Sequence, residues 1–133
     1  MNRLDFIKAY FNVVSDLGQE PKNVVVSAGG ALLLLGLREE SSDLDLDVLD
    51  EVYDAQLIGR HERFSSLGAY LDISEDVSLH RMPKGIEKIC VDGVYMYSIP
   101  EMIKQKTALS NMPDRMAGKA EKDRADIAKL LAL

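Results

Sequence analysis

The sequence has little cysteine and few aromatic residues, and it has no long apolar run. One cysteine among 133 residues, Cys90, excludes an internal disulfide and suits a reducing compartment, so we expect a cytoplasmic protein. No stretch approaches the length of a membrane span, and Arg3, Asp5 and Lys8 interrupt the apolar N-terminus. We therefore expect no membrane helix, no signal peptide and a single domain over residues 1–133.

Familiar catalytic arrangements are missing as well. The two histidines, His61 and His80, share no metal-ligand spacing with each other or with Cys90. No Ser-His-Asp or Cys-His arrangement can be argued, and no repeat or low-complexity segment is visible. The net charge of −6 argues against broad coating of nucleic acid. Residues 1–99 carry 9 basic and 17 acidic side chains, whereas residues 100–133 carry 7 and 5.

The most informative stretch runs from residue 24 to residue 49. Its β-branched run Val24–Val26 predicts a buried strand. Gly29 and Gly30 then open an apolar segment, Ala31–Leu37, which is rich in leucine and predicts a short helix. The strictly alternating run Asp43–Val48 predicts a half-buried strand.

This order of elements is suited to binding a phosphate and a metal ion. Gly29 and Gly30 would let the backbone approach a ligand closely, and the start of the helix would offer N–H groups to an anion. Asp43, Asp45 and Asp47 fall at i, i+2 and i+4, so their carboxylates share one face of the strand. Three aligned carboxylates repel each other unless water or a cation separates them, and Mg²⁺ prefers such oxygen ligands.

The Gly-Gly pair, the apolar helix and the following Ser-x-Asp-x-Asp resemble the signature of the nucleotidyltransferase superfamily, which has the polymerase-β-like fold. Residues 29–48, GGALLLLGLREESSDLDLDV, are most similar to the AbiEii-like toxin branch. Twelve residues separate Gly30 from Asp43, which fits Asp43 and Asp45 as the metal pair better than Asp45 and Asp47. The C-terminal sequence SIPEMIKQK…EKDRADIAKLL, within Ser98–Leu131, resembles the same branch.

The resemblance implies an α+β fold with a small mixed sheet and helices packed on one side. It also implies Mg²⁺ or Mn²⁺ as cofactor and a site drawn from two groups of residues. The metal-binding and catalytic residues would be Asp43, Asp45 and Asp72, the last on a later strand. The residues that hold the nucleoside triphosphate would be Gly29, Gly30, Ser42, and Lys104 or Lys106.

Two functions remain open on this reading. The first is an enzyme that transfers a nucleoside monophosphate from a nucleoside triphosphate to an acceptor hydroxyl. The acceptor would be an RNA 3′ end such as that of tRNA, a protein, or a small molecule. The second is a catalytically silent binding module on the same fold, either antitoxin-like or a phage-type interaction protein, to which small size and acidity are suited. The choice of nucleotide, the acceptor and the oligomeric state are left open.

Simpler interpretations stand beside several of these assignments. Asp72 has an alternative interpretation as an exposed edge acid, and Lys104 and Lys106 are equally solvated lysines. Arg38 fits a solvated turn better than a phosphate contact. Cys90 is expected to fill the core. Lys119 with Asp123, and Lys122 with Asp126, are spaced i, i+4 and predict ion pairs on a helix surface.

Periodicity predicts the remaining elements. Residues 3–17 and 118–131 predict amphipathic helices, and Pro100 is well placed to open a helix over residues 101–111. Residues 50–60 predict a loop and a weak helix. Residues 68–74 alternate as a strand, and Asp92-Gly93 predicts a tight hairpin between residues 86–91 and 94–98.

Overall fold

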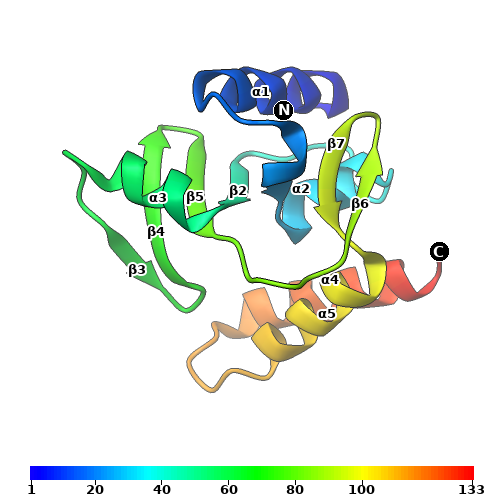
Figure 1. Cartoon of the computed structure of the whole chain (residues 1–133). Helices are drawn as coiled ribbons and strands as arrows, with labels where there is room; N and C mark the ends of the chain where they lie inside the picture. The colour runs from blue at the N-terminus through cyan, green and yellow to red at the C-terminus, as the bar shows by residue number, and fades with distance from the viewer.

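The computed structural model describes residues 1–133, apart from the side chain of Ala28. The chain forms five α-helices and one sheet, and Figure 1 shows how they are arranged. The elements, in chain order, are α1 (Arg3–Asp16), the 3₁₀ turn η1 (Pro21–Asn23), β1 (Val24–Val26), α2 (Ala28–Leu34), β2 (Leu44–Val48), α3 (Asp50–Leu57), β3 (Arg63–Ser65), β4 (Gly68–Ser74), β5 (Val77–Arg81), β6 (Lys88–Val91), β7 (Val94–Tyr97), α4 (Ile99–Ser110) and α5 (Ala117–Leu131).

The sheet is mixed and seven-stranded, with the order β3-β4-β5-β2-β1-β7-β6. Its centre is the antiparallel pair β1–β2. The meander β3-β4-β5 joins one side of this pair through the parallel contact β2–β5, and the hairpin β6–β7 joins the other through the parallel contact β1–β7. The predicted α+β class with a mixed sheet is therefore confirmed.

Strand register gives the sheet two different faces. Val26 pairs with Leu46, while Val25 pairs with Asp47, and directly paired residues share a face. Leu44, Leu46 and Val48 are all buried on the first face. Alternation therefore directs Asp45 and Asp47 to the opposite face, as the sequence predicts.

Helices cover both faces, so the expectation of helices on one side is wrong. A Cβ built on Gly30 of α2 would meet the Val26 side chain at 2.8 Å and the Phe6 ring of α1 even more closely, so α1 and α2 pack on the Val26 face. A cavity lined by Asp45 and Asp47 is bounded by residues of α4, which therefore lies over the other face. In Figure 1, α1 and the α4–α5 pair lie at opposite sides of the molecule.

The helix after β1 differs from its prediction at both ends. It begins at Ala28, so both glycines lie in its first turn, with Ser27 as the N-cap residue. It ends at Leu34 because Gly36 adopts the left-handed conformation at φ 76°. The Leu37 N–H then donates to the Leu32 carbonyl at 2.8 Å, which closes the helix end with a Schellman-type bond.

Of the remaining predictions, some are confirmed and others are wrong. The strand over residues 68–74 is confirmed, and the hairpin turn is confirmed with left-handed residues at Asp92 (φ 51°) and Gly93 (φ 81°). Strands β3 and β5 were not predicted. Cys90 was expected in the core but is exposed on β6.

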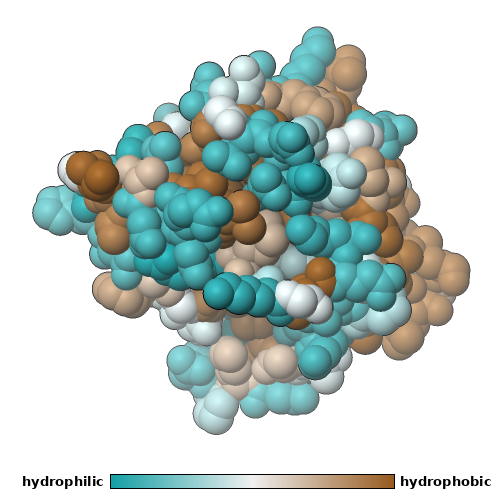
Figure 2. All heavy atoms as spheres, viewed as in Figure 1, coloured by the Kyte–Doolittle hydropathy of each residue, from teal (hydrophilic) through white to brown (hydrophobic). Residues whose placement is uncertain are grey.

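Surface polarity is uneven. Figure 2 shows polar atoms across the middle of one face and apolar surface at its right edge, over the C-terminal end of α5, where Leu131 and Leu133 are exposed. Among the described residues, no helix is both long enough and apolar enough to cross a membrane.

Candidate functional site

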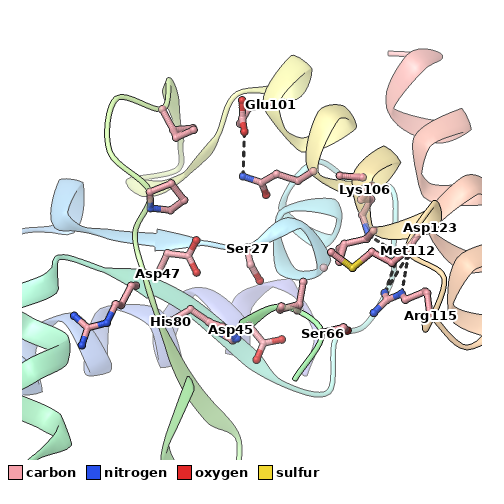
Figure 3. A pocket seen from close by; sticks show the side chains of 18 residues that line it. Ser27, Asp45, Asp47, Ser66, His80, Glu101, Lys106, Met112, Arg115 and Asp123 are labelled. Carbon is pink, nitrogen blue, oxygen red and sulfur yellow. Dashed lines mark hydrogen bonds and ion pairs between the residues drawn. The ribbon is translucent and has the colours of Figure 1, made fainter. Parts of the chain in front are cut away.

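The Asp45 face of the sheet and helix α4 enclose a cavity of about 580 Å³. Strands β2 and β5 form its floor, the β1–α2 junction and the β3–β4 turn contribute its edges, and α4 with the segment leading into α5 forms the opposite side. Figure 3 shows Asp45, Asp47, His80 and Ser27 on the sheet side, with Lys106, Arg115 and Asp123 on the helical side. The cavity therefore joins acidic and basic groups that lie far apart in the sequence.

Asp45 and Asp47 form the acidic wall of this cavity. Neither carboxylate forms an ion pair with any described residue. Asp47 accepts a hydrogen bond from the Tyr97 hydroxyl. The two carboxylates therefore carry negative charge that the described protein groups leave without a cationic partner.

Asp47 is half-buried and Asp45 is exposed, but the walls of the cavity remove part of the water around both carboxylates and so affect their ionisation. Loss of hydration raises the pKa of the Asp47 carboxyl, and the hydrogen bond from Tyr97 and the neighbouring His80 offset part of the rise. Loss of hydration also raises the pKa of Asp45, His80 lowers it, and the charges of Asp43 and Asp72 raise it further. A proton on either carboxylate, or a cation bound beside it in the cavity, would therefore be stabilising.

His80 is a member of the cavity that we did not predict. It lies on β5 directly beside Asp47 of β2, and its ring stacks on Tyr70 of β4 at a centroid distance of 5.6 Å. Its Nδ1 is buried without a hydrogen-bond partner among the described residues. Ser78 and His80 alternate with the buried Leu79, which is a pattern typical of a strand, but the run is short and ends in a charged residue.

Five charged side chains form a buried charge network beside the cavity. Lys106 Nζ lies 3.0 Å from Asp126 Oδ2 and 3.6 Å from Asp123 Oδ1. Arg115 contacts Asp123 through Nε at 3.1 Å and Nη2 at 3.2 Å, while Arg38 Nη2 lies 2.8 Å from Asp126 Oδ2. Three cations thus share two carboxylates, which leaves one surplus positive charge.

This network corrects two of our expectations. Asp123 and Asp126 were expected on the surface with Lys119 and Lys122, but they are 3% and 2% exposed and pair with residues outside α5. Arg38 was expected to be solvated, but it is largely buried against Asp126. The i, i+4 spacing shows that these side chains are neighbours on α5, but it does not indicate which face of α5 packs on α4.

The two glycines have different surroundings. Gly29 lines the cavity, and a Cβ built on it would have only Arg38 Nη1 within 4 Å, at 3.6 Å. Gly30 is buried away from the cavity, where Phe6 and Val26 leave no space for a side chain. Gly29 therefore keeps the backbone open to the cavity, while Gly30 permits close packing of α2 on α1 and β1.

The structure brings some of the predicted site residues together and separates others. Gly29, Asp45 and Lys106 line the cavity. Four others lie outside its lining: Asp43, Ser42 and Lys104, which are exposed, and the buried Gly30. Asp72, also outside the lining, accepts a hydrogen bond from Ser78 Oγ at 2.8 Å and pairs with Arg63 at 3.3 Å.

The acidic wall fits a divalent cation only in part. Within the described side chains, no three His, Cys, Asp or Glu groups come together as a ligand set for a metal. Mg²⁺ commonly takes just one or two carboxylates and completes its shell with water and substrate phosphates. Asp45 and Asp47, which lack cationic partners, match that smaller ligand set.

Neither a model of a known protein family nor a curated protein sequence matches this chain.

Proposed function

We propose that this chain is a metal-dependent nucleotidyltransferase that uses a nucleoside triphosphate. The proposal is carried by one observation, a single cavity with carboxylates on β2 that lack a cationic partner at one side and the cations Lys106 and Arg115 at the other. A metal–triphosphate needs both kinds of wall, because the cation requires carboxylate oxygens and the phosphates require positive charge.

Each wall has a distinct task in this proposal. Asp45 and Asp47 would hold Mg²⁺ or Mn²⁺, which supplies charge neutralisation of the phosphates. Lys106 and Arg115 face the cavity beside the acids Asp123 and Glu101, and these two cations would attract the phosphate tail. Gly29 would let the tail approach the backbone, as its missing side chain leaves the cavity open there.

The reaction would be an in-line displacement at the α-phosphorus. The acceptor hydroxyl oxygen forms a bond to that phosphorus, the bond to the pyrophosphate oxygen breaks, and the hydroxyl proton passes to solvent. The residues of the cavity position the triphosphate for this step rather than form a covalent intermediate with it. The acceptor would be an RNA 3′ end such as that of tRNA, a protein hydroxyl or a small molecule.

One observation favours the silent binding module instead. The resemblance implies a third acid at Asp72, yet Asp72 is held by Arg63 and Ser78 outside the cavity lining. The enzyme requires a metal ion between the acidic wall and the triphosphate, whereas the binding module has no such requirement. The metal dependence of nucleotide binding therefore separates the two functions.

Calorimetric titration with each of the four nucleoside triphosphates, with and without Mg²⁺ or Mn²⁺, tests the proposal. We expect heat that requires the metal and is lost in Asp45→Asn, but retained in Asp16→Asn, an exposed acid on α1. Incubation of labelled nucleotides with tRNA and protein acceptors then tests transfer. Transfer that persists in Asp45→Asn refutes the metal site, and absence of heat with every nucleotide leaves the binding module.

A further inference from the structure

Tyr97 is the one described residue that hydrogen-bonds the carboxylate of Asp47. It lies on β7, and Asp47 lies on β2, with β1 between them. The register aligns Tyr95 with Val25 and Val25 with Asp47, so Tyr95, Tyr97 and Asp47 share the cavity face of the sheet. The Tyr97 side chain thus crosses an intervening strand to reach this one acid.

The environment of Tyr97 keeps it a hydrogen-bond donor. Its side chain is fully buried, and its hydroxyl donates to Asp47 Oδ2. Because the ring is packed in the core, this donor has a fixed position.

The other oxygen of Asp47 is left free. Oδ1 accepts no hydrogen bond from the described residues and is not among their buried unpartnered atoms, and Asp47 lines the cavity. One oxygen is thus held by the fold and one is open to a ligand. This is the arrangement by which groups behind a metal ligand fix its orientation.

Asp43 has no comparable support. It precedes β2, is exposed and lies outside the cavity lining, although its spacing from Gly30 matches the family pattern better. No described side chain forms a hydrogen bond or ion pair with its carboxylate; the contact at this residue is the Ser41 hydroxyl donating to its backbone carbonyl.

We propose that Tyr97 is a positioning residue that fixes Asp47, so that Asp47 rather than Asp43 shares the divalent cation with Asp45. This inference rests on the proposed function, because it assigns the ligands of the same cation. It shifts the ligand pair two residues along β2 from the register that the resemblance implies.

Calorimetric titration of the intact chain with Mn²⁺ alone tests this assignment without relying on catalysis. Loss of a group that orients a metal ligand weakens metal affinity by about 10-fold to 100-fold, so we expect that loss in Tyr97→Phe. Tyr95→Phe is the matched control, since Tyr95 lies on the same strand and face without a hydrogen bond to Asp47. Asp43→Asn should bind Mn²⁺ like the wild type.

A double-mutant cycle separates positioning from general destabilisation. If Tyr97 acts through Asp47, Asp47→Asn and the double variant with Tyr97→Phe should bind Mn²⁺ equally weakly. Wild-type affinity in Tyr97→Phe, together with loss in Asp45→Asn, would overturn the inference and leave the proposed function standing. Binding that Asp45→Asn leaves unchanged would overturn the proposed function itself.

A folding failure of Tyr97→Phe would still leave a decisive comparison. Thermal unfolding followed by circular dichroism identifies that case. The inference then depends on Asp47→Asn and Asp43→Asn, both of which keep the backbone and shape. Stronger loss of Mn²⁺ affinity in Asp43→Asn than in Asp47→Asn would contradict it, and the reverse order supports it.

Discussion

The two charged sides of the cavity are built on opposite principles. In the charge network, Asp123 and Asp126 each contact two cations, so burial of these charges is accompanied by ion pairs. In the acidic wall, Asp45 and Asp47 share no cation with the described residues, and burial raises the pKa of both. The first arrangement holds helices together, whereas the second leaves charge without a partner and is typical of a binding site.

Breaking the charge network should have the largest effect on stability. Lys106→Met keeps the length of the side chain but removes the cation shared by Asp123 and Asp126. Removing one partner of a buried ion pair costs about 3 kcal/mol or more in free energy of unfolding. We expect the lower value here, because Arg38 and Arg115 still neutralise the two carboxylates. Urea unfolding measures this loss.

The control for this variant is Lys104→Met, two residues earlier on the same helix. Lys104 is exposed and has no ion pair, so its replacement should change the free energy of unfolding by about 0.5 kcal/mol or less. Equal effects of the two variants would show that the network does not stabilise the helical side of the cavity.

The next largest effect should come from Gly30→Ala. The new Cβ would overlap the buried Phe6 ring and the Val26 side chain, and overpacking of this kind costs about 1 to 3 kcal/mol. Gly29→Ala should leave the free energy of unfolding nearly unchanged, because its Cβ has only Arg38 nearby at 3.6 Å. We expect it instead to weaken nucleotide binding.

This pair of variants separates the packing role from the binding role of the Gly-Gly motif. Urea unfolding and calorimetry with a nucleoside triphosphate and Mg²⁺ measure the two quantities on each variant. Nucleotide affinity that survives Gly29→Ala would show that the backbone at this position does not approach the ligand.

Local patterns predicted much of the fold, because the decisive information lay within a few neighbouring residues. Alternation over Leu44–Val48 and Gly68–Ser74 gave both strands, and Asp92-Gly93 gave the hairpin turn. Strand β5 escaped prediction because its pairing with β2, 33 residues earlier, decides its structure, and β3 escaped because it is only three residues long and fully exposed.

The candidate site was predicted less completely for the same reason. The aligned carboxylates were visible in the sequence, but which of them face the cavity depends on the start of β2 and on the position of α4. The roles of Tyr97, His80 and Asp126 depend on partners far away in the sequence, such as Asp47 for Tyr97 at a separation of 50 and Arg38 for Asp126 at a separation of 88. Such contacts have no periodic signature.

Removing charge from the acidic wall should stabilise the protein. The pKa of Asp47 is raised in the folded state, so the folded protein binds more protons than the unfolded chain at pH values between the two pKa values. Stability contributed by this group is therefore greatest at low pH and falls as pH rises through the folded-state pKa. We expect Asp47→Asn to unfold at a higher temperature than the wild type at neutral pH.

Thermal unfolding across mildly acidic to neutral pH measures this effect. The difference between Asp47→Asn and the wild type should shrink as the pH falls, and Mg²⁺ should raise the unfolding temperature of the wild type more than that of the variant. A variant that is less stable than the wild type at neutral pH would show that ionised Asp47 is stabilised in the fold, contrary to the comparison of the two walls.

The smallest effect concerns Asp72, which acts on the acidic wall from outside the cavity. Its ion pair with Arg63 is exposed on both sides, so Asp72→Asn should change the free energy of unfolding by about 0.5 kcal/mol or less. Because the Asp72 charge contributes to the raised pKa of Asp45, the same variant should lower the pKa of Asp45 in a carboxyl NMR titration. Arg63→Gln should raise it, since it leaves the Asp72 charge without its cation. If neither variant moves the Asp45 titration, the charge of Asp72 does not reach the acidic wall, and the third acid that the resemblance implies has no part in this site.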